Sequence, residues 1–127
     1  MALRERHPDH GEPGTAPHLA LRACVERVAE RRYRRDGYWV LARNWRCPSG
    51  EIDLTPERRG VVVFSEVKTR SSTAFGLPAE AVDRRRQSRL RAAAATWIRS
   101  TGAHPTELRF DVVSVLPGRV ERLEGAF

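Results

Sequence analysis

The chain has 127 residues, of which 40% are hydrophobic and 31% charged, so it has enough apolar material for one core and is not wholly disordered. Its 23 basic and 16 acidic residues give a formal charge of +7, which favours a polyanionic partner because Lys and Arg release condensed counterions when they meet phosphates. No stretch approaches the roughly 18 consecutive apolar residues of a membrane span, and Cys24 and Cys47 are too few for a disulfide framework. We therefore expect a cytoplasmic protein that does not bind membranes.

The first half of the chain predicts one helix and three strands. Residues 1–18 are polar and rich in Pro and Gly, so we expect a disordered N-terminal arm, followed by a domain over residues 19–127. From Leu19, apolar residues recur every three or four positions, which predicts a helix that ends before Gly37. Strands are expected over 38–42, 51–55 and 61–68, with turns over 48–50 and 56–60.

The second half predicts another helix and further strands. Pro78 suits the first turn of a helix, whose apolar stripe continues to about Ser100, before Gly102. Branched residues over 108–115 predict a fourth strand, and residues 119–123 a short fifth. The order helix, three strands, helix, strand is typical of one α/β domain around a mixed central sheet.

Two carboxylates are expected to meet on neighbouring strands. Period-two geometry places Asp53 on one face of its strand and both Ile52 and Leu54 on the other. The following turn sets Asp53 roughly opposite Glu66, and like charges that face each other across strands repel. A divalent cation held by Asp53 and Glu66, with the Val67 carbonyl as a further ligand, relieves that repulsion. These hard oxygen ligands favour Mg²⁺ or Mn²⁺ over zinc.

Lys68 is the only lysine in the chain and shares a strand face with Glu66. Its charge can stabilise an oxyanion or orient an attacking water. Two carboxylates and a lysine around one metal suit phosphodiester hydrolysis, and Glu26 on the first helix is an additional carboxylate candidate. The alternative is an exposed Glu–Lys ion pair, the usual role of this tripeptide. The apolar strand before it, the companion Asp53 and the uniqueness of the lysine favour catalysis.

Basic residues around this site are candidates for contacts with a phosphate backbone. The segment after Lys68 leaves the site directly, and we favour it over the arginine run at 84–91, which spreads around the second helix. For that run, a solvated helix face and phosphate contact are equally expected. The nucleic-acid-binding candidates are Lys68, Thr69, Arg70, Arg85, Arg86 and Arg89.

Two segments, Gly-Glu-Ile-Asp-Leu at 50–54 and Val-Phe-Ser-Glu-Val-Lys-Thr-Arg at 63–70, resemble the core motif of the YraN-like family of small bacterial proteins. The resemblance covers about residues 20–127, and further matches lie at 37–38, 44–46, 75–76, 109–113 and 125–127. That family is placed in the restriction-endonuclease-like superfamily, near Holliday-junction resolvases. The resemblance therefore implies a single restriction-endonuclease-like domain with the element order given above.

The resemblance also implies a nuclease site. In it, Asp53 and Glu66 are metal ligands, Lys68 is the catalytic lysine and Glu26 is the glutamate of the helix. The leading hypothesis is an Mg²⁺- or Mn²⁺-dependent endonuclease that hydrolyses DNA, at branched or damaged structures. A non-catalytic nucleic-acid-binding module, or an adaptor in a DNA-processing complex, fits the basic charge equally well. RNA stays an alternative to DNA, and a homodimer stays open because many enzymes of this fold dimerise to cut two strands.

Overall fold

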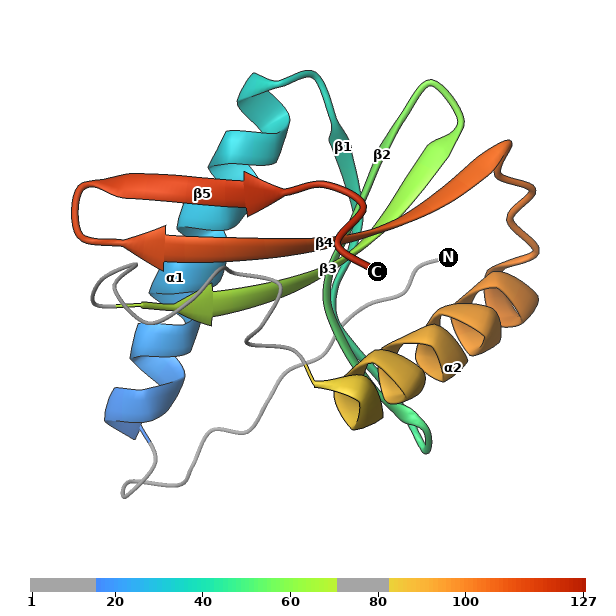
Figure 1. The fold of residues 1–127 in the computed structure, drawn as a ribbon, viewed down its shortest axis with the longest axis horizontal. Helices are drawn as coiled ribbons and strands as arrows, with labels where there is room; N and C mark the ends of the chain where they lie inside the picture. Colours follow the sequence, from blue (N-terminus) through green and yellow to red (C-terminus); the bar gives the residue numbers. More distant parts are fainter. Residues whose placement is uncertain (1–15, 71–82) are drawn as a thin grey trace.

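The computed structural model describes residues 16–70 and 83–127 of the chain. Its order of elements confirms the predicted α/β class, with one helix before three strands and a second helix before the last two strands (Figure 1). Neither helix in these residues is both long enough and apolar enough to cross a membrane. The elements are α1 (Ala16–Arg35), β1 (Trp39–Cys47), β2 (Gly50–Arg58), β3 (Val61–Thr69), α2 (Arg84–Thr101), β4 (Glu107–Leu116) and β5 (Arg119–Leu123).

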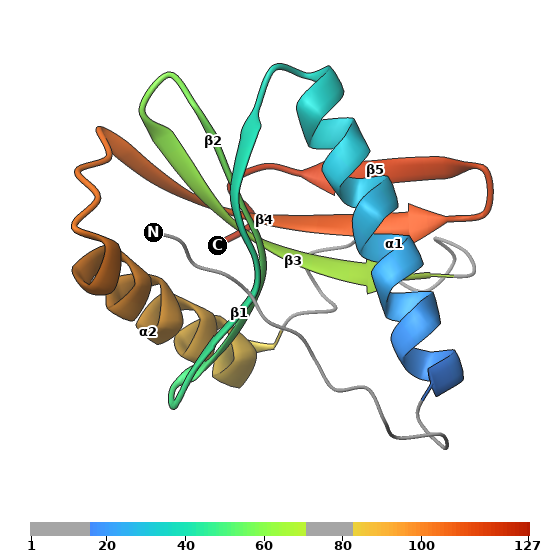
Figure 2. The ribbon, with the colours of Figure 1, turned by 180° about the vertical axis from the view of Figure 1, so that it is seen from behind.

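The strands form one mixed sheet in the order β1-β2-β3-β4-β5. Strands β3 and β4 are parallel and paired along their whole length, from Val61 with Glu107 to Thr69 with Val115, while the other neighbours are antiparallel. Parallel neighbours need a crossover connection, and α2 lies in the connection between β3 and β4. The two helices cover opposite faces of the sheet (Figures 1 and 2).

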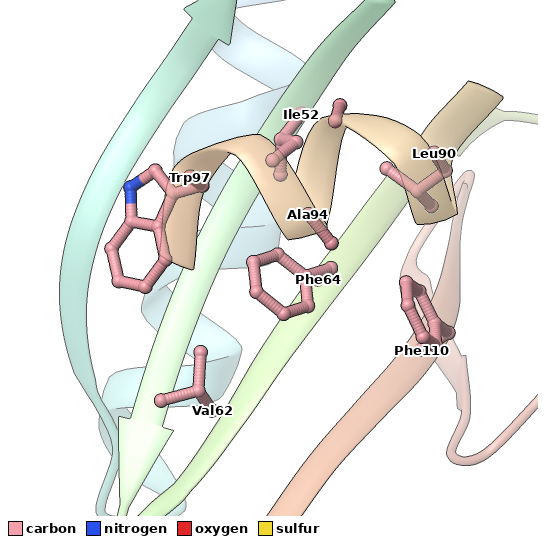
Figure 3. Close-up of a cluster of buried hydrophobic side chains, with 8 residues drawn as sticks. Ile52, Val62, Phe64, Leu90, Ala94, Trp97 and Phe110 are labelled. Carbon is pink, nitrogen blue, oxygen red and sulfur yellow. The ribbon is translucent and has the colours of Figure 1, made fainter. Parts of the chain in front are cut away.

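Helix α2 packs on one face through a cluster of apolar side chains. Phe64 of β3 lies between Trp97 of α2 and Phe110 of β4, with ring centroids 5.7 and 5.6 Å away (Figure 3). Phe127 stacks on Phe110 at 5.3 Å, so the last residue extends the cluster. Aromatic pairs in such arrangements bury large apolar areas and hold the helix against the sheet. The buried members are Ile52, Val62, Phe64, Leu90, Ala93, Ala94, Trp97 and Phe110.

Helix α1 packs on the opposite face, where the core has a polar centre. Asp111 of β4 is fully buried and accepts a hydrogen bond from the Tyr33 hydroxyl at 2.8 Å. The Arg109 guanidinium donates to both oxygens of Asp111, at 2.8 and 2.9 Å. A buried carboxylate needs partners of this kind, so the network fixes α1 against β4. The apolar residues around it are Ala29, Tyr33, Tyr38, Leu54, Val63 and Val113.

The turn predicted over 56–60 is shorter in the structure. Pro56 lies inside β2, and the turn is formed by Arg59 and Gly60, whose φ angles are 53° and 84°. The proline is tolerated because β1 has one extra residue between Val40 and Arg43 relative to its partner strand. Such a bulge interrupts the hydrogen-bond ladder at the place where proline has no N–H to donate.

Helix α1 begins earlier than predicted. Its first residue is Ala16 rather than Leu19, and Pro17 then takes a first-turn position where its missing N–H leaves no helical hydrogen bond unmade. The end of the expected N-terminal arm is therefore helical. Residues 1–15 of that arm lie outside the described residues.

Helix α2 begins at Arg84 rather than in a turn that starts at Pro78. Asp83 has an extended backbone and is the N-cap, and its side chain accepts a hydrogen bond from the Arg86 N–H at 2.9 Å. A continuous helix from Pro78 is thus wrong, because the chain enters the helix only after this cap. Outside the described residues lie 71–82, with Pro78 and the motif at 75–76.

Candidate active site

The candidate site lies where β2 and β3 separate. The paired residues of β2 and β3 nearest to the site are Leu54 and Ser65. Asp53 and Glu66 are the neighbours of this pair, so they lie where the pairing between the two strands ends. There, Oδ2 of Asp53 accepts a hydrogen bond from the Val67 N–H at 2.8 Å. The side chain of Asp53 thus bridges the two strands at the end of their backbone pairing.

Strand β2 changes face at this point. Ile52 packs in the α2 cluster and Leu54 packs in the α1 cluster, so the prediction that these two residues share one face is wrong. The strand still pairs with β1 through Ile52 and Trp45, but its register pairs with β3 have ended, which allows its backbone to twist. Asp53, between the two apolar residues, is buried and lines a cleft.

This cleft has a volume of about 620 Å³ and lies between α1, the separated ends of β2 and β3, and the first turns of α2. It brings together the four residues for which the sequence predicts catalytic roles: Glu26, Asp53, Glu66 and Lys68. Such a concave site with convergent charged groups is where chemistry is most often found in a protein. The other lining residues are Leu21, Arg22, Val25, Glu51, Val67, Thr69, Arg86, Arg89 and Leu90.

The predicted nucleic-acid contacts divide into two groups. Thr69, Arg86 and Arg89 line the cleft together with Lys68 and the carboxylates. Arg70 does not line it; this residue is half-buried at the end of β3, and its N–H donates to the Val115 carbonyl at 3.0 Å. Arg85 is exposed on α2 and does not line it either.

Glu66 faces two basic side chains within the cleft. Oε2 of Glu66 lies 3.9 Å from the Lys68 ammonium nitrogen and forms an ion pair with the Arg86 guanidinium. Arg86 is the third residue of α2, and its backbone N–H is held by the Asp83 cap. The start of α2 therefore positions a positive charge against the carboxylate of β3.

Arg22 of α1 also lines the cleft, although the sequence pattern predicts no role for it. Its Nη2 atom lies 3.1 Å from Glu51, 3.5 Å from Glu26 and 3.6 Å from Asp53, measured to one carboxylate oxygen of each. The spacing of Arg22 and Glu26, four residues apart on a helix, predicts their ion pair. The contacts with β2 depend on where α1 crosses the sheet.

Two carboxyl groups of the cleft, those of Asp53 and Glu26, have raised pKa values and so resist ionisation. Burial raises the pKa of Asp53 from 3.8 to about 7, the charge of Glu66 adds to the shift, and the Val67 N–H opposes it. Burial also raises the pKa of Glu26. A carboxylate that is costly to ionise in the protein alone is stabilised by a cation that binds its charged form.

The oxygen donors fit a divalent cation that keeps part of its water. Among residues 16–70 and 83–127, no group of three or more His, Cys, Asp or Glu side chains is arranged to hold a metal ion. Asp53 and Glu66 offer two carboxylates, and the Val67 carbonyl is on the same strand as Glu66. Mg²⁺ is commonly held by one or two carboxylates, with waters and substrate phosphates completing its shell. This donor set therefore suits a catalytic ion better than a closed structural one.

We expect Asp53→Asn to stabilise the metal-free protein at pH 8 and to change its stability little at pH 4. The folded-state pKa of about 7 lies above the ordinary 3.8, so the contribution of protonated Asp53 is complete below pH 3.8 and is lost as the pH rises through 7. Above that pH only the wild type buries the charge, at a cost of up to about 4 kcal/mol. Urea unfolding in EDTA at both pH values measures the difference. An equal effect of Asp53→Asn at pH 4 and pH 8 would contradict this assignment.

Comparison with known proteins identifies relatives over most of the chain. The model of the family described as Uncharacterised protein family UPF0102 matches residues 25–115, which include all four candidate catalytic residues. A UPF0102 protein of Beutenbergia cavernae is 50% identical over 111 residues, which cover 84% of this chain and 94% of the relative. One of Frankia alni is 48% identical over 113 residues, covering 85% and 94%. One of Moorella thermoacetica is 49% identical over 89 residues, covering 70% and 74%.

Proposed function

The chain belongs to the UPF0102 family, as its YraN-like motifs indicate, and we propose that it is a metal-dependent endonuclease that hydrolyses DNA phosphodiester bonds. The observation that carries the proposal is the meeting of two buried carboxylates, Asp53 and Glu66, with the chain's single lysine in one cleft. The order of helices and strands agrees with the restriction-endonuclease-like core that the motifs imply. The net charge of +7 suits a polyanionic substrate.

In the proposed reaction, each residue of the cleft has a distinct role. Asp53 and Glu66, with the Val67 carbonyl, would hold Mg²⁺ or Mn²⁺, and the bound ion would supply a Lewis acid that polarises a phosphoryl oxygen and activates water. Water attacks phosphorus in line with the leaving oxygen, and the P–O bond to that oxygen breaks. The attacking water loses a proton, and the leaving oxygen takes up a proton from solvent, so the products are a phosphate monoester and a hydroxyl. Lys68 stabilises the negative charge that develops on the phosphate, and Glu26 accepts a hydrogen bond from water in the cleft.

Branched or damaged DNA is the substrate that we propose, and a cleavage assay tests it. Linear duplex, single-stranded, nicked and four-way-junction DNA are each incubated with the protein in Mn²⁺, in Mg²⁺ and in EDTA. We expect cutting that requires the metal, is fastest on the junction or the nicked duplex, and is absent in Asp53→Ala. Metal-independent cutting, or equal cutting by the variant after repurification, would contradict the proposed site. RNA oligonucleotides in the same assay distinguish the two nucleic acids.

One observation favours a second candidate, a nucleic-acid-binding module without catalysis. Arg22 and Arg86 already form ion pairs with the carboxylates of the cleft, so the site has positive charge without any metal. Calorimetric titration with Mn²⁺ separates the candidates. We expect one Mn²⁺ site in the wild type and its loss in Asp53→Ala, because the variant lacks one of the two carboxylates that hold the metal in the proposed function. No binding in the wild type, together with salt-sensitive DNA binding, would favour the second candidate.

A further inference from the structure

Helix α1 carries a row of exposed arginines on its outer side. The row consists of Arg27, Arg31 and Arg35, which follow one another at intervals of four residues. Each of the three arginines follows a buried residue by two positions in the chain. Two positions correspond to a rotation of about 200° around a helix, so the arginines point away from the sheet. None of the three has an ion-pair or side-chain hydrogen-bond partner within the part of the chain that the structure describes.

The row differs from the other arginines of the same helix. Arg32 pairs with Asp36 at 3.2 Å, and Arg34 pairs with Glu30 at 2.9 Å. Like charges four residues apart on a helix repel each other. The row contains two such pairs of arginines, and it includes no acidic residue that would offset the repulsion. The negative end of the helix dipole attracts a cation only within the last turn, so it accounts for Arg35 but not for the two earlier members.

A strongly basic groove lies beside the row. It has a volume of about 670 Å³, lies between the C-terminal half of α1 and the β4–β5 turn, and is lined by five arginines and no acidic residue. Arg32 fixes one of its walls, because its Nη1 atom donates to the Val120 carbonyl at 3.1 Å. The lining residues are Val28, Arg31, Arg32, Arg34, Arg35, Gly118, Arg119 and Val120.

On the other side of the row, a second groove lies next to the cleft. This groove of about 500 Å³ lies between α1 and β1, is lined by Arg27 and Arg31, and shares Glu26 with the candidate active site. The row therefore begins next to the cleft and continues along the C-terminal half of α1, beside the basic groove. Figure 2 shows α1 crossing this face of the sheet. The length of the row, from Arg27 to Arg35, is about 12 Å at 1.5 Å per helical residue.

We propose that this arginine row is a second phosphate-binding surface, which holds the sugar-phosphate backbone of the nucleic acid outside the cleft. The identity of the polyanion rests on the proposed function. Guanidinium groups bind phosphate oxygens through two parallel N–H donors. A length of about 12 Å equals the rise of between three and four nucleotides along the axis of a DNA duplex, at about 3.4 Å each. The row thus extends the contact of a substrate whose scissile bond lies at Asp53 and Glu66.

The test is DNA binding at several salt concentrations with all metal chelated by EDTA. We compare the wild type with Arg31→Gln/Arg35→Gln and with a control, Arg59→Gln/Arg99→Gln, on a fluorescent duplex. Both double variants lower the formal charge from +7 to +5, and the control residues line neither the cleft nor the two grooves. We expect the row variant to weaken binding about 30-fold at 0.15 M salt and to reduce the slope of log K against log salt by about 1.8, as two lost duplex phosphate contacts require. The control should bind like the wild type.

Equal weakening in both double variants would show an effect of net charge alone and would overturn the proposal, as would unchanged binding in the row variant. Vesicles of phosphatidylserine and phosphatidylcholine in equal parts provide a further arm. If the row variant lost vesicle binding but kept duplex binding, a membrane surface would replace nucleic acid as the ligand. The outcome is independent of cleavage. If the protein cuts no DNA but the row variant weakens DNA binding, the phosphate-binding row is supported and the proposed function is wrong. If the protein cuts DNA but the row variant binds it normally, the proposed function is supported and the phosphate-binding row is wrong.

Discussion

Lys68→Ala should slow metal-dependent DNA cleavage by about 10²–10³-fold, the usual effect of removing one preorganised donor that stabilises transition-state charge. The Lys68 ammonium lies 3.9 Å from Glu66 and lines the same cleft, so it is in place before a substrate arrives. Its side chain is 21% exposed, and removal of a partly exposed ion pair costs about 1 kcal/mol or less. The variant should therefore fold and bind Mn²⁺ while it cuts slowly. Single-turnover cleavage on the preferred substrate measures the effect.

Lys68→Arg is the matched variant for this prediction. It keeps the positive charge, but the planar guanidinium distributes its donors differently from a compact ammonium. We expect Lys68→Arg to bind DNA as the wild type does and to recover only part of the lost rate. If Lys68→Ala cut within tenfold of the wild type under the same conditions, Lys68 would not be the residue that stabilises the transition state.

The strand pattern predicts the meeting of the two carboxylates but not the detailed course of β2. A turn between β2 and β3 sets Asp53 near Glu66 as long as the hairpin stays antiparallel, which the register confirms up to Leu54 and Ser65. Alternation along β2 predicts one face for Ile52 and Leu54, yet these residues pack on opposite faces. The change occurs where pairing with β3 ends, and the extent of that pairing depends on the folded sheet rather than on the local sequence.

Other differences have local or distant causes. The start of α2 has a local signal in the sequence, because Asp is a preferred N-cap residue. Its side chain accepts a hydrogen bond from a backbone N–H two or three residues later, as Asp83 does from Arg86. The position of Pro56 within β2 has none, since it depends on a bulge in the neighbouring strand β1. The contacts of Arg22 with Glu51 likewise follow from packing between elements that are distant in sequence.

Asp111→Ala should lower the free energy of unfolding by about 3–5 kcal/mol, which is the usual cost of leaving the partner of a buried ion pair uncompensated. Asp111 is fully buried, and its oxygens accept hydrogen bonds from Tyr33, Arg109 and the Gly125 N–H. It is the register partner of Ser65, the residue just before Glu66, so the network also supports the strand that carries the candidate site. Thermal and urea unfolding should both show the loss, with a decrease in Tm of about 10–20 °C.

Two further variants separate the buried charge from simple loss of contacts. Glu121→Gln removes the charge partner of Arg119 in an exposed pair at 3.0 Å and should change stability by less than about 1 kcal/mol. Arg109→Leu/Asp111→Ala removes both charges of the buried pair, and replacing both partners by apolar groups is often close to neutral. The double variant should therefore be more stable than Asp111→Ala alone, even though it also lacks the hydrogen bond from Arg109 to the Tyr38 hydroxyl. A double variant no more stable than Asp111→Ala would mean that packing, rather than an unpaired guanidinium, explains the loss.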